Sequence, residues 1–147
     1  MPTKYAHELQ AGDAYASFAF TVTPELNQQF LFAVEDYNRC YLDGQDGRPP
    51  LVHPVVLMHM TPRTRSPSFA QAPGFGSALA RDSGRWLRPV HVGEALRVDW
   101  IVNRTYEQRG RIYQDYVATV HDEQGEPVFR RETSATFFAL APKEASR

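Results

Sequence analysis

Hydrophobic and polar residues alternate with a period of two over most of the second half of the chain. The apolar positions of residues 95–103 all fall on one face, at Leu96, Val98, Trp100 and Val102. Successive side chains of a strand point to opposite faces, so this pattern predicts a strand. Residues 112–120 and 129–137 follow a similar pattern after polar turns at 107–110 and 121–127. Three strands joined by short turns predict an antiparallel meander.

The first half of the chain begins with a predicted strand and a predicted helix. Residues 14–22 alternate aromatic and small side chains, which favours a strand. Thr23 and Pro24 are typical of a helix start, because threonine can cap the first turn and proline is tolerated there. The helix is expected to end near Asn38 or Cys40. Its apolar stripe consists of Leu26, Phe30, Ala33, Val34 and Tyr37.

A loop, a second helix and an irregular stretch are expected next. Glycine, aspartate and proline dominate residues 43–50, which predicts a loop. A short buried helix is expected over 52–60, with Pro54 in its first turn and Pro62 beyond its end. The prolines and glycines of 63–76 predict irregular chain.

The order of these elements indicates an α+β fold, in which helix packs on one face of a curved sheet. A chain of 147 residues is the size of one ordinary domain. We therefore expect a single domain over 1–147, with its core at about 14–139 and a frayed polar tail at 141–147.

The composition excludes several classes of partner. The chain has 16 basic and 17 acidic side chains and a formal net charge of −1, which gives nucleic acid or an anionic membrane no electrostatic attraction. No apolar stretch approaches the roughly 20 residues that span a bilayer, and residues 1–10 lack the apolar run of a secretory signal. Cys40 is the only cysteine, which excludes an intrachain disulfide and fits a reducing compartment. We expect a soluble cytoplasmic protein.

Four local strings, in order, resemble elements of one enzyme family. Residues 32–43 (FAVEDYNRCYLD) are similar to its GDxNPxHxD element, and residues 85–94 (RWLRPVHVGE) to its strand start F-x-RPVxxGDxL. Residues 106–110 and 122–126 are similar to its hairpin turns. Over residues 14–138 the chain thus resembles the MaoC-like hydratases and dehydratases.

The resemblance implies a hot-dog fold, in which a curved antiparallel sheet wraps round a central helix. It implies a homodimer, or a heterodimer with another hot-dog subunit. It also implies a hydro-lyase that adds or removes water across the double bond of a 2-enoyl thioester. Coenzyme A or the phosphopantetheine arm of an acyl carrier protein would be part of that substrate, and no separate cofactor is expected.

The same resemblance places Asp36 and Asn38 in the active site, Asp36 to hold and activate the water and Asn38 to orient. The alternatives are a helix-terminal acid that hydrogen-bonds within a loop and an asparagine that simply forms a turn. Two positions depart from the family pattern. Tyr41 stands where a histidine is expected, and residues 52–54 (VHP) stand where AHG opens the central helix. A tyrosine, with an ordinary pKa of about 10, is a poor base. Two roles remain for Tyr41, a hydrogen-bond donor in the site or a packed aromatic side chain.

His53 is the candidate that replaces the missing imidazole, because an ordinary histidine pKa of about 6.5 lets the ring donate or accept a proton. The alternative is a core or capping histidine whose ring nitrogens are satisfied. Pro54 removes one N–H at the helix start. The donor that polarises the thioester carbonyl is therefore expected among the amides of His53, Val55 and Val56.

Candidate binding residues flank this region. Arg63 and Arg65, next to prolines, could bind the phosphates of coenzyme A through paired hydrogen bonds, with Arg85 and Arg88 as alternative candidates, although surface arginines are common. Trp86 could line an acyl tunnel or belong to the core. No metal site is expected, because His53 and His59 are six residues apart and fall on different helix faces.

Three functions remain open from the sequence. The leading one is the hydro-lyase, with Asp36 as base, Asn38 orienting, His53 assisting, and an amide near Val55 stabilising the enolate. The second is a non-catalytic hot-dog subunit that binds an acyl chain and completes a partner's dehydratase site. The third is an acyl thioesterase. One fold hosts several activities, so the geometry of the site has to decide among them.

Overall fold

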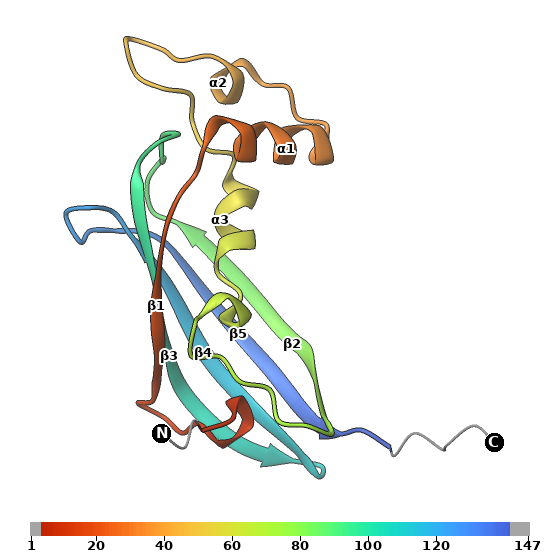
Figure 1. Cartoon of the computed structure of the whole chain (residues 1–147). Coiled ribbons are helices and arrows are strands. Elements are labelled where there is room, and N and C mark those ends of the chain that lie inside the picture. The colour runs from red at the N-terminus through yellow and green to blue at the C-terminus, as the bar shows by residue number, and fades with distance from the viewer. Residues whose placement is uncertain (1–3, 142–147) are drawn as a thin grey trace.

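The computed structural model describes residues 4–141 of the chain. Its main element is a curved antiparallel sheet, whose strands lie in the order β1-β3-β4-β5-β2 (Figure 1). The strands are β1 (Ala14–Thr21), β2 (Phe75–Trp86), β3 (Ala95–Gln108), β4 (Arg111–His121) and β5 (Pro127–Ala139). Strands β3, β4 and β5 are consecutive neighbours, whereas β1 and β2 form the two edges.

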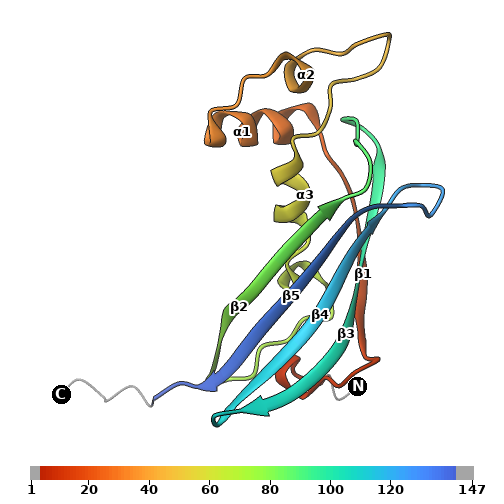
Figure 2. The ribbon, with the colours of Figure 1, turned by 180° about the vertical axis from the view of Figure 1, so that it is seen from behind.

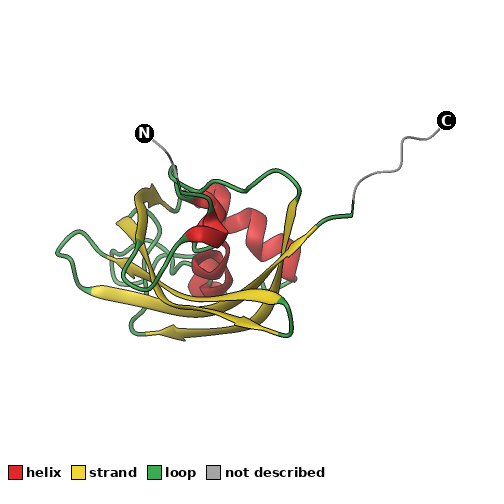
Figure 3. Ribbon diagram, turned by 90° about the horizontal axis from the view of Figure 1, so that it is seen from below, coloured by secondary structure: helices red, strands yellow, loops and turns green. Residues whose placement is uncertain are grey.

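The helices lie on one side of this sheet. They are α1 (Pro24–Val34), α2 (Arg39–Leu42) and α3 (Pro54–Met60), with 3-10 turns η1 (Ala6–Glu8) and η2 (Arg63–Arg65). Helix α3 lies in the concave face of the sheet, with α1 and α2 gathered at its N-terminal end (Figure 1). The described residues place no helix on the opposite face (Figure 2), and from below the sheet is seen to curve round the helices (Figure 3). This is the α+β, hot-dog arrangement expected from the sequence.

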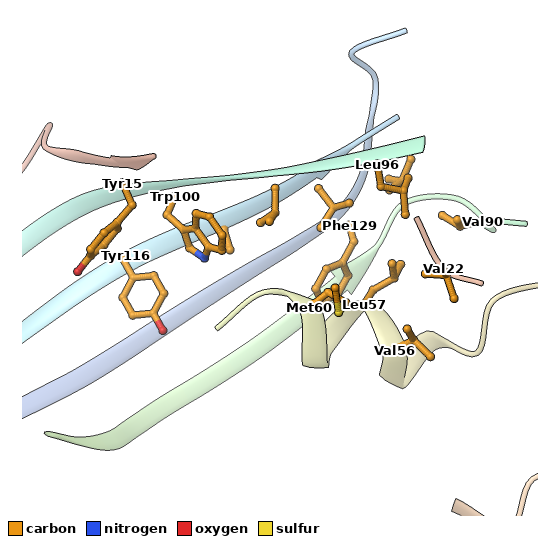
Figure 4. Packing of buried hydrophobic residues seen from close by; sticks show 14 of the residues in the cluster. Tyr15, Val22, Val56, Leu57, Met60, Val90, Leu96, Trp100, Tyr116 and Phe129 are labelled. Carbon is orange, nitrogen blue, oxygen red and sulfur yellow. The ribbon is translucent and has the colours of Figure 1, made fainter. Parts of the chain in front are cut away.

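The core lies between α3 and the concave face of the sheet. All four apolar positions of the expected face of β3 are buried, at Leu96, Val98, Trp100 and Val102. Val56, Leu57 and Met60 of α3 belong to the same cluster (Figure 4). Burying an apolar side chain of this size contributes roughly 1.5–3 kcal/mol, so this contact holds the helix to the sheet. Trp100 Nε1 also donates to the backbone oxygen of Thr61, at 2.8 Å, just beyond the end of α3.

Several expected elements are confirmed. The strand at 14–22, the short helix at 52–60 and the three-strand meander correspond to β1, α3 and β3 to β5. Residues 63–76 are irregular apart from η2, up to the start of β2 at Phe75. The expected frayed tail at 141–147 lies outside the described residues except for Ala141. No helix within the described part of the chain is long and apolar enough to cross a membrane.

The first helix is shorter than expected. Helix α1 ends at Val34 rather than near Asn38 or Cys40, because Glu35 takes left-handed backbone angles (φ 55°) that stop the helix. Beyond it, Asp36 Oδ1 and Asn38 Oδ1 each accept from the backbone amide two residues ahead, at 3.0 and 3.1 Å. Local bonds of this kind compete with helical hydrogen bonds.

The buried face of α1 also differs from the predicted apolar stripe. Asn27 and Leu31 are each 1% exposed, whereas Val34 and Tyr37 are 44% and 53% exposed. A polar residue therefore occupies the centre of the contact between α1 and the rest of the molecule.

Strand β2 was not predicted over most of its length. Alternation indicates strands only from Gly84 onward, yet β2 begins at Phe75. Its sequence, FGSALARDSGRW, contains glycine, alanine and aspartate, which have low strand propensity. Pairing with β5 nevertheless extends from Phe75 opposite Ala139 to Trp86 opposite Phe129. The neighbouring strand, rather than local propensity, makes this segment a strand.

One arginine of the sheet forms an ion pair with the neighbouring strand and a hydrogen bond with the end of α3. Arg131 of β5 donates from Nη2 to Asp82 Oδ2 of β2, at 2.6 Å, and from Nη1 to the backbone oxygen of Met58, at 2.8 Å. The Arg131 and Asp82 side chains are only 13% and 20% exposed. The hydrogen bond from Arg131 holds the pKa of Asp82 below its ordinary value of 3.8.

We predict that Asp82→Asn lowers the free energy of unfolding at neutral pH by about 2 kcal/mol, because Arg131 loses its anion. The pKa of Asp82 is lowered in the folded state, so this stabilisation is complete above about pH 4 and is lost as the pH falls through the folded-state pKa. Urea unfolding at several pH values measures both effects. Glu132→Gln, in the exposed pair with Arg130, is the control and should cost less than about 1 kcal/mol. Equal costs for the two variants would contradict the prediction.

Candidate functional site

Two polar residues after the end of α1 form a tight turn. Asp36 Oδ1 accepts from the Asn38 N–H at 3.0 Å, and Asn38 Oδ1 accepts from the Cys40 N–H at 3.1 Å. Asn38 therefore caps the start of α2 with its side chain and orients the Asp36 carboxylate with its backbone. The Asp36 side chain is 40% exposed, so the carboxylate is open to solvent.

The residue before α3, His53, caps that helix with its ring. His53 Nδ1 accepts from the Val55 N–H at 3.2 Å, and His53 Nε2 lies 3.2 Å from Asp36 Oδ2. Because Nδ1 serves as an acceptor, we assign the ring proton to Nε2, which donates it to the carboxylate. A carboxylate and an imidazole 17 residues apart in sequence thus form one pair, with both ring nitrogens occupied.

Asn27 of α1 ties the segments that carry this pair together. Its Oδ1 accepts from the His53 N–H at 2.9 Å. Its Nδ2 donates to the carbonyl oxygens of Leu51 and Tyr41, at 3.0 and 3.3 Å. One buried side chain thereby links α1 to α2 and to the chain that leads into α3. No apolar residue can satisfy the same three backbone groups.

An apolar cavity of about 340 Å³ lies beside the start of α3. Trp86 lines it, and Trp86 Nε1 donates to the Pro54 carbonyl oxygen at 3.1 Å, which fixes the indole in the wall. The aliphatic part of the lining includes Leu51, Val52, Leu57, Leu87 and Val90. A cavity of this size and composition suits a small apolar ligand group.

Tyr41 connects the cavity to the Asp36–His53 pair. It lines the cavity, and its ring packs edge-on against the His53 imidazole with 4.9 Å between ring centroids. Burial, together with the neighbouring Cys40 thiol and Asp36 carboxylate, raises the pKa of Tyr41 above its ordinary value of 10.0. The phenol is therefore neutral at physiological pH and can donate a hydrogen bond.

The backbone amides at the start of α3 already have acceptors. The His53 N–H donates to Asn27 Oδ1, and the Val55 N–H donates to His53 Nδ1. The Val56 N–H donates to the His53 carbonyl oxygen at 3.0 Å, and Pro54 has no N–H. We therefore assign no substrate contact to the amides of Val55 and Val56, in contrast to the expectation from the sequence.

The two arginines expected to bind phosphate lie away from the cavity. Arg63 is 4% exposed, and its Nη1 donates to Gln114 Oε1 at 2.9 Å. Its guanidinium lies over three aromatic rings, so it belongs to the interior. Arg65 Nε donates to the His59 carbonyl oxygen at 2.9 Å. Burial removes Arg63 as a surface contact for phosphate, and Arg65 is engaged at the end of α3.

The structure therefore brings four of the sequence candidates together and puts a fifth in the cavity wall. The four are Asp36, Asn38, Tyr41 and His53, and the fifth is Trp86. Among residues 4–141, no group of three or more His, Cys, Asp or Glu side chains is placed to hold a metal ion.

Asn27 is not among the functional residues expected from the sequence. A signal for it does exist, because Asn27 and Leu31 are four residues apart and so share one face of a helix. A polar side chain on the same face as a core leucine has to find hydrogen-bond partners when that face is buried. The predicted stripe placed the buried face elsewhere, and the partners come from distant segments.

No protein-family model matches the sequence, and no curated protein does. Solved structures match it in fold. The MaoC-like dehydratase from Rhodospirillum rubrum superposes with a TM-score of 0.71 at 16% sequence identity, over 94% of this chain and 99% of that chain. The R-hydratase PhaJ1 from Pseudomonas aeruginosa superposes with a TM-score of 0.68 at 18% identity, over 95% and 93% of the two chains.

A third similar structure is a complex, ChsH1–ChsH2 from Mycobacterium tuberculosis. It superposes with a TM-score of 0.69 at 12% identity, over 87% of this chain and 90% of that chain. The hot-dog fold expected from the sequence is thereby confirmed. Identities this low establish the fold and leave the chemistry open.

Asn27→Ala is predicted to lower the free energy of unfolding by about 3 kcal/mol, because two carbonyl oxygens and one N–H lose their partners in the interior. Urea unfolding followed by circular dichroism measures this loss. Asn103→Ala, at an exposed position of β3, is the matched control and should cost less than about 0.5 kcal/mol. A cost below about 1 kcal/mol at Asn27 would mean that its three hydrogen bonds do not hold the site together.

Proposed function

We propose that this protein is a MaoC-like hydro-lyase, which adds or removes water across the double bond of a 2-enoyl thioester. The observation that carries the proposal is the 3.2 Å contact between Asp36 Oδ2 and His53 Nε2 near an apolar cavity. The reaction needs a placed base for water and apolar room for an acyl chain, and these residues supply both. The fold shared with an R-hydratase and a MaoC-like dehydratase supports the same reading.

Asp36 acts as the base in this proposal. Both His53 nitrogens are occupied, so the free lone pairs of the pair belong to the carboxylate. The carboxylate takes a proton from water while the hydroxide adds to C3 of the substrate, and it then returns a proton to C2. Because one carboxylate performs both transfers, the hydroxyl group and the new C2 hydrogen enter on the same face. Dehydration follows the same steps in reverse.

His53 and Asn38 position the carboxylate. The His53 Nε2–H donates to Asp36 Oδ2, and the Asn38 N–H donates to Asp36 Oδ1, so that both oxygens are held. A base that is already oriented does not have to be ordered in the transition state. The loss of either bond is therefore expected to slow the chemical step more than to weaken substrate binding.

The cavity is the proposed site for the acyl chain. Its wall contains Trp86 and Leu57, and most of the other lining side chains are aliphatic. The thioester would be carried on coenzyme A or on the phosphopantetheine arm of an acyl carrier protein. Either arm is part of the substrate, so the proposed reaction requires no separate cofactor.

A second function has its own support, namely a non-catalytic subunit that binds the acyl chain and completes a dehydratase site on another hot-dog subunit. It is favoured by the engaged amides of His53, Val55 and Val56, which leave no free backbone donor for the thioester carbonyl at the start of α3. The similar ChsH1–ChsH2 structure is a complex of two proteins, as this function requires.

We propose that β2 is the edge along which a second hot-dog subunit, identical or related, pairs with this chain. The backbone of β1 is bonded to a loop at Ala16, since the Ala16 N–H donates to Ser68 Oγ at 2.8 Å and the Ser66 hydroxyl donates to the Ala16 carbonyl oxygen at 2.7 Å. Strand β2 has β5 on one side, and most of its 12 residues are exposed. A long edge of this kind is a template for pairing with another chain.

Asp36→Asn is expected to lower kcat for the hydration of a short 2-enoyl-coenzyme A by about 10³-fold, because an amide cannot take the proton from water. Loss of the ultraviolet absorbance of the enoyl thioester measures hydration, and circular dichroism checks the fold. Asp43→Asn is the matched control, since Asp43 is an exposed carboxylate that binds Arg39, and it should leave kcat unchanged. Equal rates for Asp36→Asn and the wild type would rule out Asp36 as the base.

The same assay with His53→Asn separates the two roles of His53, namely capping α3 and positioning the Asp36 carboxylate. Asparagine can still accept from the Val55 N–H, but its short side chain cannot reach Asp36, so kcat should fall on the order of 10²-fold in a folded protein. Hydration that requires a mixture with a related hot-dog subunit would favour the second function instead.

Leu79→Lys is expected to shift the protein from dimer toward monomer in sedimentation velocity. Leu79 is 61% exposed on β2, and a charge on a strand edge opposes pairing. Ile101→Lys, at a 46% exposed position of the interior strand β3, is the control and should leave the dimer intact. A monomeric wild type, or a Leu79→Lys variant that remains fully dimeric, would count against pairing through β2.

A further inference from the structure

The proposed reaction needs one group beyond the Asp36–His53 pair. As hydroxide adds to C3, the electrons of the double bond move toward the thioester carbonyl, and negative charge develops on its oxygen. A preorganised donor at that oxygen is usually the largest contribution to catalysis of such a step. The amides of His53, Val55 and Val56 are bonded within the protein, so the donor has to come from elsewhere.

We propose that the Tyr41 hydroxyl donates a hydrogen bond to the thioester carbonyl oxygen, an assignment that rests on the function proposed above. Tyr41 lines the apolar cavity and also contacts the His53 ring, which in turn binds Asp36. A thioester whose acyl chain fills the cavity and whose C3 faces Asp36 would pass the phenol. The hydroxyl then meets the atom on which charge develops.

Two contacts hold the phenol in place. Asn27 Nδ2 donates to the Tyr41 backbone oxygen at 3.3 Å, and the Tyr41 ring packs edge-on against His53. The donor and the Asp36–His53 pair therefore depend on the same buried amide. A donor fixed in this way needs little reorganisation when the charge appears.

The phenol acts as a donor and keeps its proton. Burial, the Cys40 thiol and the Asp36 carboxylate all raise the pKa of Tyr41, so the phenolate is disfavoured at physiological pH. The proton balance is closed by Asp36, which takes one proton from water and returns one to C2. The electron pair that moves onto the carbonyl oxygen returns to form the new C–H bond.

This role also accounts for a tyrosine at the position where the resemblance to MaoC-like enzymes implies a histidine. The imidazole comes from His53 at the start of α3, so position 41 does not have to supply it. The space beside the cavity is then available to a donor with an aromatic body.

Tyr41→Phe tests the assignment, because phenylalanine keeps the ring contact with His53 and removes only the hydroxyl. We expect kcat for enoyl-thioester hydration to fall by about 10²-fold and KM to change by less than about threefold, since the bond strengthens in the transition state. Tyr37→Phe is the matched control, because Tyr37 is 53% exposed and does not line the cavity, and its kcat should stay at the wild-type value. Wild-type kcat in Tyr41→Phe would overturn the proposal and leave the role of Asp36 intact.

Infrared difference spectroscopy tests the same bond without turnover. With a thioester labelled with carbon-13 at the carbonyl, the wild type should lower the C=O stretching frequency relative to the free thioester, and Tyr41→Phe should lose most of that shift. The frequency shift can be measured even if the chain binds the thioester without hydrating it. The Tyr41 assignment and the proposed hydration activity can therefore be tested separately. Equal shifts in the two proteins, no shift in the wild type, or no binding at all would overturn the assignment.

Discussion

One buried amide side chain sets the geometry on which the candidate site depends. Asn27 binds the backbone of Tyr41, Leu51 and His53 at the same time, so α1, α2 and the start of α3 occupy fixed positions relative to one another. The Asp36–His53 contact requires the end of α1 and the start of α3 to lie in these relative positions. Each bond adds only about 1 kcal/mol, whereas leaving its backbone partner unpaired costs more. The hydrogen bonds of Asn27 thus determine how α1, α2 and the start of α3 are arranged, whereas burial of the apolar core supplies most of the stability of the fold.

The His53 ring makes two contacts in the candidate site. His53 caps α3 through Nδ1 and holds Asp36 through Nε2, so the start of the helix and the orientation of the Asp36 carboxylate depend on one ring. The same cap occupies the Val55 amide, and Pro54 lacks one. In the proposed reaction a side chain therefore has to stabilise the charge on the substrate, and Tyr41 both contacts the His53 ring and lines the cavity.

Elements with a strong period could be predicted from the sequence, whereas features set by distant neighbours could not. The buried face of β3 and the helix that became α3 follow from their apolar residues. Strand β2 depends on pairing with β5, which its small residues do not indicate. The sequence indicates three of the site residues, namely Asp36, Tyr41 and His53. It does not indicate the contacts among them, because these contacts join three separate segments of the chain. The burial of Arg63 could not be predicted, because most of the aromatic side chains that surround it come from distant segments of the chain.

In the proposed mechanism one carboxylate, Asp36, both activates the water and protonates C2. The stereochemistry of hydration in heavy water tests it most directly, because the deuterium at C2 and the hydroxyl at C3 record the faces from which they came. If Asp36 performs both transfers, the deuterium and the hydroxyl enter on the same face of the enoyl double bond. Entry on opposite faces, or no conversion of the thioester by the purified chain, would contradict it.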